Sequence, residues 1–380
     1  VAWDDWLAAA PPGSPPDDVR PLPNLLYTSG TTGVPKGVEL PPAMFAGGST
    51  MTEHLEGLRS NRFAPYGMHL VAGPLHHTGP LQAVRLLAVG VPITIPGRFD
   101  PERVLATIER DRVETSVVVP THLRRLLALP DEVRRRYDVT SIRLVAHTGS
   151  ACPEDVKRRM IDWWGPVFVD AYGGTEAGTV CSITTEEWLE RPGSVGRCTP
   201  MFEPVVVDGD GRPVPPGVEG RLYFRDRTGR GIVYEGDPAK TAAAHLEPGV
   251  FTLGEVGYVD DAGYVFITDR FSDLVVSGGV NLYPAEAEQV LAGHPGVADV
   301  AVIGVPDDDL GEALKALVVP VDPATPPRPD ELLAFCRERL TSMKCPRSVD
   351  LVDTVGRTAM GKVDKRALRA PFWSGGRTIG

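Results

Sequence analysis

The sequence predicts an α/β protein of two parts: a large N-terminal domain with parallel α/β layers and a β-rich subdomain, and a small α+β C-terminal domain. Between residues 69 and 171, short apolar segments alternate with amphipathic ones, a pattern typical of parallel strands covered by helices on both faces. From about Val205, short strands and tight turns replace this alternation. A charged, glycine-rich joint at residues 269–279 then precedes a unit large enough to form a separate domain.

The elements of the large domain follow from the periodicity of apolar residues. Short apolar runs predict buried strands, and apolar residues spaced three or four apart predict helices. The expected strands lie at 69–72, 91–95, 116–120, 144–146 and 167–171, and the expected helices at 3–10, 44–58, 81–89, 101–112 and 153–164. A further helix is expected to begin at Thr121, whose hydroxyl is a suitable N-cap after the proline that ends the preceding strand.

The β-rich subdomain and the C-terminal domain are predicted from the remaining segments. Glycines and aspartates at 207–211 indicate tight turns, and 220–224 indicates a short strand. Helices are expected at 284–292 and 329–343, and strands at 300–305 and 313–321. The predicted domains are residues 1–270 and residues 271–380.

Length, charge and cysteine usage limit the functional classes. A chain of 380 residues is too long for one ordinary core, which favours two or more domains. The net charge of −11, without a long basic cluster, argues against a nucleic-acid partner. No apolar run is long enough for a transmembrane segment, and there is no leader signal at the start. The five cysteines lack metal-ligand spacing and fit reduced thiols, so the predicted location is cytoplasmic.

The segment from Tyr27 to Gly37 has the composition of a phosphate-binding loop. Its glycines allow close backbone approach, its hydroxyls can donate to phosphate oxygens, and its lysine adds a positive charge. The candidate ligands are Thr28, Ser29, Gly30, Thr31, Thr32, Gly33 and Lys36. The segment does not fit the G-x-x-x-x-G-K-[ST] pattern of common nucleoside triphosphatases, and composition alone leaves a mobile surface turn equally open.

The string TSGTTGVPKG resembles the phosphate-loop signature of the adenylate-forming (AMP-binding) superfamily, which includes acyl-CoA synthetases, luciferases and the adenylation domains of peptide synthetases. Further segments in the family's order extend the resemblance over nearly the whole chain. Among these enzymes, the details are most similar to fatty-acyl and steroid- or bile-acid-type CoA ligases. The resemblance implies ATP, Mg²⁺ and coenzyme A as cofactors and a small carboxylic acid as substrate.

Two motifs after expected strands resemble the family's adenine site. Gly149-Ser150-Ala151 is similar to the backbone strip beside the base. Tyr172-Gly173-Gly174-Thr175-Glu176 is similar to the Y-G-x-T-E signature, which implies that Tyr172 stacks on the base, Gly173 and Thr175 line it, and Glu176 holds Mg²⁺. The alternative is a strand-ending turn with an incidental glutamate.

His77 is the third candidate for the active site. A lone histidine after a strand is most often structural, but the resemblance implies that His77 lines the acyl pocket near the substrate carboxylate. The F-D-x-S setting of amino-acid-activating domains is absent, which argues against an amino-acid substrate.

Three segments further along the chain imply how the nucleotide and coenzyme A are held. Glu255 stands where the family has an aspartate that binds the ribose hydroxyls, so the ribose geometry is expected to differ. Asp269–Asp273 resembles the D-R-x-x-D hinge, with Arg270 as a nucleotide contact and Ser272 as the pivot. Gly278 and Gly279 resemble the loop that forms the pantetheine tunnel.

Lys362 is the principal catalytic candidate. The segment Gly356–Lys362 fits G-x-x-x-x-G-K, but Val363 replaces the Ser/Thr of a Walker loop. The segment instead resembles the family's C-terminal R-T-x-x-G-K motif, whose lysine bridges the substrate carboxylate and the α-phosphate. Two anions must meet before they react, and such a cation makes that possible.

The sequence therefore predicts an AMP-forming acid–thiol ligase of lipid or fatty-acid metabolism, with Lys362, His77 and Glu176 as catalytic residues. Two alternatives stay open: an impaired or non-catalytic nucleotide-binding remnant, and a ligase that loads a separate carrier protein. The loop comes within 30 residues of Val1, whereas in the family a substantial region precedes it. An uncovered apolar face is therefore expected, with either marginal stability of the chain alone or self-association through that face.

Overall fold

The computed structural model describes residues 5, 8–9, 13, 17–19, 21, 25–28, 36–39, 48–75, 77–277, 280–358 and 361–373. Residues 25–28, 36, 39, 78, 82, 272 and 281 are described by their backbone alone. Ser29 to Gly33, Gly278 and Gly279 lie outside the described residues, so the predicted roles of these phosphate- and pantetheine-binding residues stay predictions.

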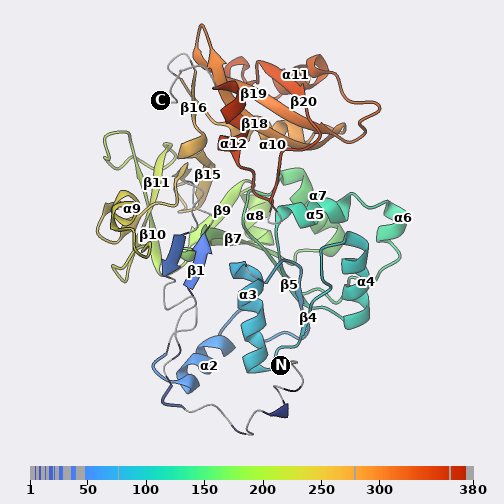
Figure 1. The fold of residues 1–380 in the computed structure, drawn as a ribbon, viewed down its shortest axis with the longest axis vertical. Coiled ribbons are helices and arrows are strands. Elements are labelled where there is room, and N and C mark those ends of the chain that lie inside the picture. Colours follow the sequence, from blue (N-terminus) through green and yellow to red (C-terminus); the bar gives the residue numbers. More distant parts are fainter. Residues whose placement is uncertain are drawn as a thin grey trace.

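A thirteen-stranded sheet forms the large part of the molecule (Figure 1). Its first half is parallel, with strand order β4-β3-β5-β6-β7, as the alternating apolar pattern predicts. The strands are β3 (His69–Val71), β4 (Ile93–Thr94), β5 (Thr115–Val118), β6 (Leu144–His147) and β7 (Phe168–Gly174). The associated helices are α2 (Met51–Arg59), α3 (Thr78–Arg85), α4 (Pro101–Asp111), α5 (Pro120–Leu127), α6 (Asp131–Arg134) and α7 (Glu154–Trp164), with a 3-10 turn at Leu86–Val89.

The core of this half lies between the sheet and its helices. The apolar positions of α4, α5 and α7 pack on the strands, and the largest fully buried members are Leu70, Leu105, Ile108, Leu123, Leu126, Met160 and Phe168. Burying each side chain of this size stabilises the fold by about 1.5–3 kcal/mol.

The second half of the large sheet is antiparallel and carries the β-rich part. It continues from β7 through β8 (Gly178–Thr184), β9 (Ser194–Cys198), β15 (Val265–Arg270), β14 (Glu255–Val259) and β11 (Gly220–Asp226). The outer members are β10 (Phe202–Val207), β12 (His245–Glu247) and β13 (Val250–Phe251), accompanied by the helices α8 (Thr185–Glu190) and α9 (Pro238–Ala243). The predicted subdomain thus extends the same sheet. A separate two-stranded hairpin is formed by β1 (Leu25–Thr28) and β2 (Lys36–Glu39).

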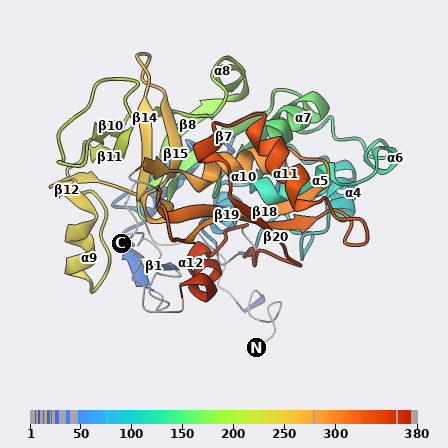
Figure 2. The same ribbon diagram turned by 90° about the horizontal axis from the view of Figure 1, so that it is seen from above.

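The C-terminal part is a small α+β unit with its own five-stranded sheet and apolar core. It contains β16 (Val275–Ser277), β17 (Val280–Leu282), β18 (Val297–Asp307), β19 (Gly311–Pro320), β20 (Ser348–Leu351), α10 (Pro284–Ala292), α11 (Pro329–Arg337) and α12 (Lys365–Arg369). Short 3-10 turns lie at Phe271–Asp273, Ser342–Lys344 and Ala370–Phe372. Figure 1 shows this unit above the large sheet, facing α5 and α7, and Figure 2 shows it from above. The predicted fold class is confirmed.

Several predicted boundaries differ from the structure. Thr121 is not the N-cap of its helix, because α5 begins at Pro120 with Val119 as N-cap. Proline is favoured at the first helical position, where its fixed φ suits the helix and its missing N–H costs nothing. The helix expected at 329–343 ends at Arg337. The helix expected at 44–58 begins at Met51, because Thr50 is its N-cap and residues 48–50 are not helical. Most of the expected helix at 3–10 lies outside the described residues.

None of the described helices has the length and apolarity that crossing a bilayer requires.

Candidate active site

The Y-G-G-T-E segment forms a tight hairpin between β7 and β8. A Cβ on Gly173 would lie only 1.7 Å from the carbonyl oxygen of Gly178, so the chain can turn here only with glycine. A Cβ on Gly174 would lie 2.9 Å from Oε2 of Glu176. The glycines thus allow Glu176, with Thr175 before it, to fold back against the end of β7.

Glu255 and Arg270 face the same end of β7 from neighbouring strands. They are directly paired across β14 and β15, and Glu255 Oε1 is 4.0 Å from Arg270 Nε. The hydroxyl of Tyr172 donates to Glu255 Oε2 over 2.8 Å. Burial raises the pKa of Glu255, although Arg270 and Tyr172 partly offset the shift. Burial also raises the pKa of Tyr172, and the charge of Glu255 raises it further, so Tyr172 is a firm hydrogen-bond donor.

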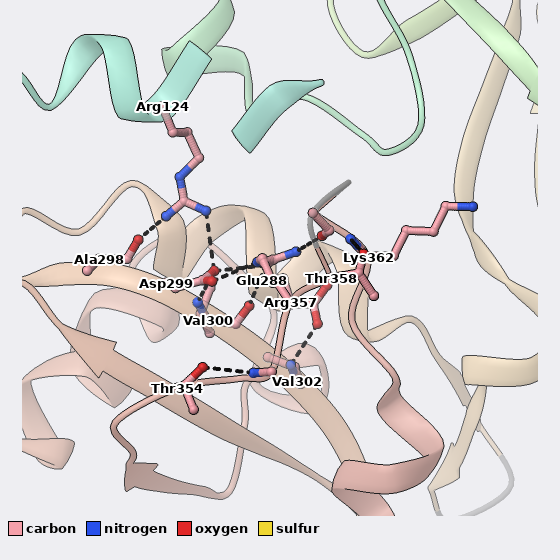
Figure 3. A network of polar contacts seen from close by, with 12 residues as sticks. Arg124, Glu288, Ala298, Asp299, Val300, Val302, Thr354, Arg357, Thr358 and Lys362 are labelled. Carbon is pink, nitrogen blue, oxygen red and sulfur yellow. Dashed lines mark hydrogen bonds and ion pairs between the residues drawn. The ribbon is translucent and has the colours of Figure 1, made fainter. Parts of the chain in front are cut away.

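Lys362 joins this group from the C-terminal unit. Its turn is held by the Thr358 N–H, which donates to the Lys362 carbonyl, and by the Lys362 N–H, which donates to the Thr358 hydroxyl. Figure 3 shows the Lys362 side chain extending away from the turn. The residue is exposed, yet partial burial lowers the pKa of its ammonium, and the charge of Arg270 lowers it further. Glu176 and Glu255 act in the opposite direction. The Lys362 ammonium therefore lies within electrostatic range of Glu176, Glu255 and Arg270.

The β1–β2 hairpin connects the predicted phosphate loop with Glu176. Thr28 pairs with Lys36 across the hairpin, and the Glu235 N–H donates to the Gly37 carbonyl over 3.1 Å. Val38 pairs with Tyr234, whose hydroxyl donates to Glu176 Oε1 over 3.4 Å. Tyr234 therefore connects the base of the predicted loop to Glu176. Tyr234 is absent from the sequence-based prediction because it belongs to none of the recognised motifs.

Other predicted residues lie at element ends without a described contact to this group. Gly149 follows β6 with a φ of +93°, and a Cβ added to it would lie 3.5 Å from Cγ1 of Val119. Ser150 and Ala151 come directly after it, ahead of α7. His77 is the N-cap residue of α3. The adenine-binding role of the first three and the acyl-pocket role of His77 stay predictions.

A buried charge cluster behind the site is missing from the sequence-based prediction. Asp170 Oδ1 lies 2.6 Å from Nε2 of His147 and 2.5 Å from Nζ of Lys157. Lys157 is 1% exposed, and its ammonium lies 4.3 Å from the centre of the Trp188 ring. Asp170 and His147 each precede a predicted adenine-site motif by two residues. The sequence offered one indication of this cluster: Lys157 falls on the same core-facing side of α7 as Met160, where a lysine needs a buried partner.

Comparison with known proteins gives the family. Residues 3–231 match the family of AMP-binding enzymes, and residues 286–362 match the AMP-binding enzyme C-terminal domain. The chain is 38% identical to a feruloyl-CoA synthase from Amycolatopsis sp., covering 92% of the chain and 69% of that relative. It is 35% identical to a fatty acid–[acyl-carrier-protein] ligase from Streptomyces coeruleorubidus, covering 94% and 69%.

The solved structures agree with this assignment. The O-succinylbenzoate coenzyme A synthetase from Bacillus subtilis, in complex with ATP and a magnesium ion, matches with a TM-score of 0.74 and 29% identity. The match covers 90% of the chain and 69% of that structure. The chain therefore belongs to the family of AMP-binding enzymes, and the predicted ATP-dependent acid–thiol ligase chemistry, through an acyl-adenylate, is confirmed.

Proposed function

We propose that the protein activates a carboxylic acid with MgATP and transfers the acyl group to coenzyme A. The substrate carboxylate attacks the α-phosphorus of ATP, which gives acyl-AMP and releases pyrophosphate. The thiol of coenzyme A then attacks the acyl carbon, and AMP leaves. The observation that carries this proposal is the cluster of Glu255, Arg270 and Tyr172 in the large part of the chain, with Lys362 of the C-terminal unit within electrostatic range of it.

The described side chains suit distinct tasks in the first step. Lys362 brings a cation between the substrate carboxylate and the α-phosphate, where charge develops in the transition state. Glu255 offers Oε1 to the ribose hydroxyls, since Oε2 already accepts from Tyr172. Arg270 is close enough to Glu255 to contact the nucleotide beside it.

Glu176 is the proposed Mg²⁺ ligand. Its carboxylate is the oxygen donor that this hard cation prefers, and the Tyr234 hydroxyl holds it beside the base of the loop. A bound Mg²⁺ would neutralise the charge on the phosphates.

For the second step we propose that the C-terminal part rotates about Ser272, so that Gly278 and Gly279 replace Lys362 at the site. This proposal includes the domain boundary at residues 270 and 271. The boundary is supported by the end of β15 at Arg270 and the start of the small sheet at Val275.

We also propose a cytoplasmic location, where ATP and coenzyme A are available. Self-association of the chain stays a prediction, which analytical ultracentrifugation would test.

The proposed substrate is an apolar carboxylic acid of the fatty-acid or steroid/bile-acid type. Relatives named for ferulate and for a fatty acid support an apolar acid, and they add aromatic acids to the candidates. The decisive experiment is a panel of fatty, steroid, bile and aromatic acids in which AMP release is measured with and without coenzyme A. Acid-dependent pyrophosphate–ATP exchange separates an active ligase from a nucleotide-binding remnant, which would show none.

A carrier protein as acyl acceptor is the second candidate, because one relative is named as an acyl-carrier-protein ligase. Mass spectrometry of the thioester product, with coenzyme A and a phosphopantetheinylated carrier offered together, distinguishes the two acceptors.

Glu255→Gln is expected to weaken ATP binding by about 1.5–3 kcal/mol, the range of a hydrogen bond to a charged group. Because burial raises the pKa of Glu255, the carboxylate protonates at a higher pH than usual, and ATP affinity should fall as the pH falls through that pKa. Glu255→Gln should abolish this pH dependence. Tyr172→Phe should shift it to higher pH, because the charged form then loses a donor. Calorimetry at several pH values measures both effects, and an unchanged affinity would mean that the ribose is held elsewhere.

Glu176→Gln is expected to raise the Mg²⁺ concentration required for half-maximal pyrophosphate exchange about tenfold or more, since one carboxylate ligand loses its charge. Tyr234→Phe is the matched comparison, because it removes only the hydroxyl that positions Glu176. Tyr234→Phe should raise the required Mg²⁺ concentration less than Glu176→Gln does. Identical Mg²⁺ titrations for the wild-type protein and Glu176→Gln would exclude Glu176 as the ligand.

A further inference from the structure

The Lys362 turn is anchored through one carboxylate of its own unit. Arg357 lies at the start of the turn, and its Nε and Nη2 donate to Asp299 Oδ2 and Oδ1 over 2.7 and 2.8 Å. Its Nη1 donates to the carbonyl of Gly361 over 2.7 Å. A bidentate arginine–carboxylate pair fixes direction as well as distance. Asp299 thus determines where the residue next to Lys362 lies.

The same carboxylate also binds a residue of the large part of the molecule. Arg124, on α5, has its Nη1 3.3 Å from Asp299 Oδ1, and its Nη2 donates to the carbonyl of Ala298 (Figure 3). Asp299 is only 22% exposed at its side chain, and Arg124 24%. The shielding from solvent strengthens the interaction relative to a surface pair. Burial alone would raise the pKa of Asp299, yet Arg357 and then Arg124 lower it overall, so the carboxylate stays charged between them.

A second contact joins α5 to the turn itself. Gly361 has a φ of +76°, and a Cβ added to it would lie 2.3 Å from the Thr121 hydroxyl oxygen. The Gly361 backbone therefore lies directly against the first turn of α5. Thr121 and Arg124 are three residues apart and share one face of the helix. This face touches the C-terminal unit at two points, both linked to the Lys362 turn.

We propose that Arg124 is a positioning residue that latches the C-terminal unit in the orientation in which Lys362 reaches the adenylation site. The proposal rests on the proposed function, because it assigns Arg124 to the first half-reaction. Any rotation that withdraws Lys362 must separate Asp299 from Arg124, whereas the Asp299–Arg357 pair lies within one unit and moves with it. Arg124 thus stabilises one orientation only, and its loss shifts the population away from that orientation.

Arg124→Ala is expected to slow carboxylate-dependent pyrophosphate–ATP exchange about tenfold, the effect of 1.4 kcal/mol on an orientation equilibrium. Thioester formation from supplied acyl-AMP and coenzyme A should stay within twofold of the wild-type rate or increase. Arg125→Ala is the matched control, since Arg125 is the exposed next residue of α5. Arg124→Lys should retain more of the exchange activity than Arg124→Ala, because lysine keeps the positive charge but lacks the planar guanidinium that binds two acceptors at once. Equal losses in both half-reactions, or none in either, would overturn the latch.

A distance measurement tests the latch without catalysis. Spin labels at the exposed positions Glu132 on α6 and Ala334 on α11 report the orientation of the two parts. In Arg124→Ala the distance distribution should broaden or shift, whereas in Arg125→Ala it should match the wild-type distribution. An unchanged distribution in Arg124→Ala contradicts the latch. If no acid supports exchange while the distances shift as expected, the proposed function fails and the latch stands.

Discussion

Lys362→Ala is expected to reduce acyl-adenylate formation by about 10²–10³-fold or more, the loss that follows removal of one electrostatic group from a reacting centre. Thioester formation from supplied acyl-AMP should be retained. The reason is that Lys362 belongs to the C-terminal unit and comes within electrostatic range of Glu176, Glu255 and Arg270 only in this orientation of that unit. Single-turnover assays of each half-reaction measure the two effects separately.

Two comparisons sharpen this test. Lys344→Ala removes a lysine that is paired with Glu286, inside the C-terminal unit, and should leave adenylation unchanged. Lys362→Arg keeps a permanent charge. Because burial and Arg270 lower the pKa of Lys362, adenylation by the wild-type protein should decline as the pH rises through that pKa. Lys362→Arg should retain some activity and lose this decline. Equal losses of both half-reactions in Lys362→Ala would remove the lysine from its proposed role.

Local patterns in the sequence were sufficient to predict the fold class. The alternation of apolar strands and amphipathic helices predicted the parallel half of the sheet, because burial on both faces requires continuous apolar strands. The boundaries failed where local chemistry allowed two solutions. Thr121 can cap a helix, but Pro120 can also begin one, and the structure uses the proline. The β-rich segments gave no signal that β9 and β15 would join them to the parallel strands.

The candidate site was accessible to sequence analysis only through motifs. Spacing cannot show that Lys362 approaches Glu176, because the contact depends on how two folded units dock. The resemblance supplied that expectation, but it did not include Arg124, Asp299 or Tyr234. These residues act through contacts between the two units or between strands that are distant in the sequence. Local sequence patterns do not predict such contacts.

Asp170→Asn is the second prediction with a large effect, this time on folding. Replacing Asp170 leaves the ammonium of Lys157 without its countercharge at a site where the side chain is 1% exposed. Removing one partner of a buried ion pair typically costs about 3–5 kcal/mol of the free energy of unfolding. Burial lowers the pKa of Lys157, so part of this cost can be relieved by deprotonation of the lysine. Urea denaturation at pH 7 measures the loss.

The pH dependence and a charge-free variant distinguish an ion-pair effect from a packing effect. Burial raises the pKa of Asp170, but His147 and Lys157 lower it overall, so the folded-state pKa lies below the ordinary value. The stability that Asp170 contributes is therefore present above the ordinary carboxyl pKa and is lost as the pH falls toward the folded-state pKa. The double variant Asp170→Leu with Lys157→Met removes both charges and should cost less than Asp170→Asn alone. Asp162→Asn, at an exposed position of α7, is the control and should change stability by no more than about 0.5 kcal/mol. If Asp170→Asn lowers the free energy of unfolding no more than that control does, the charge of Asp170 does not stabilise buried Lys157. The cluster would then have no structural role next to the adenine-site motifs.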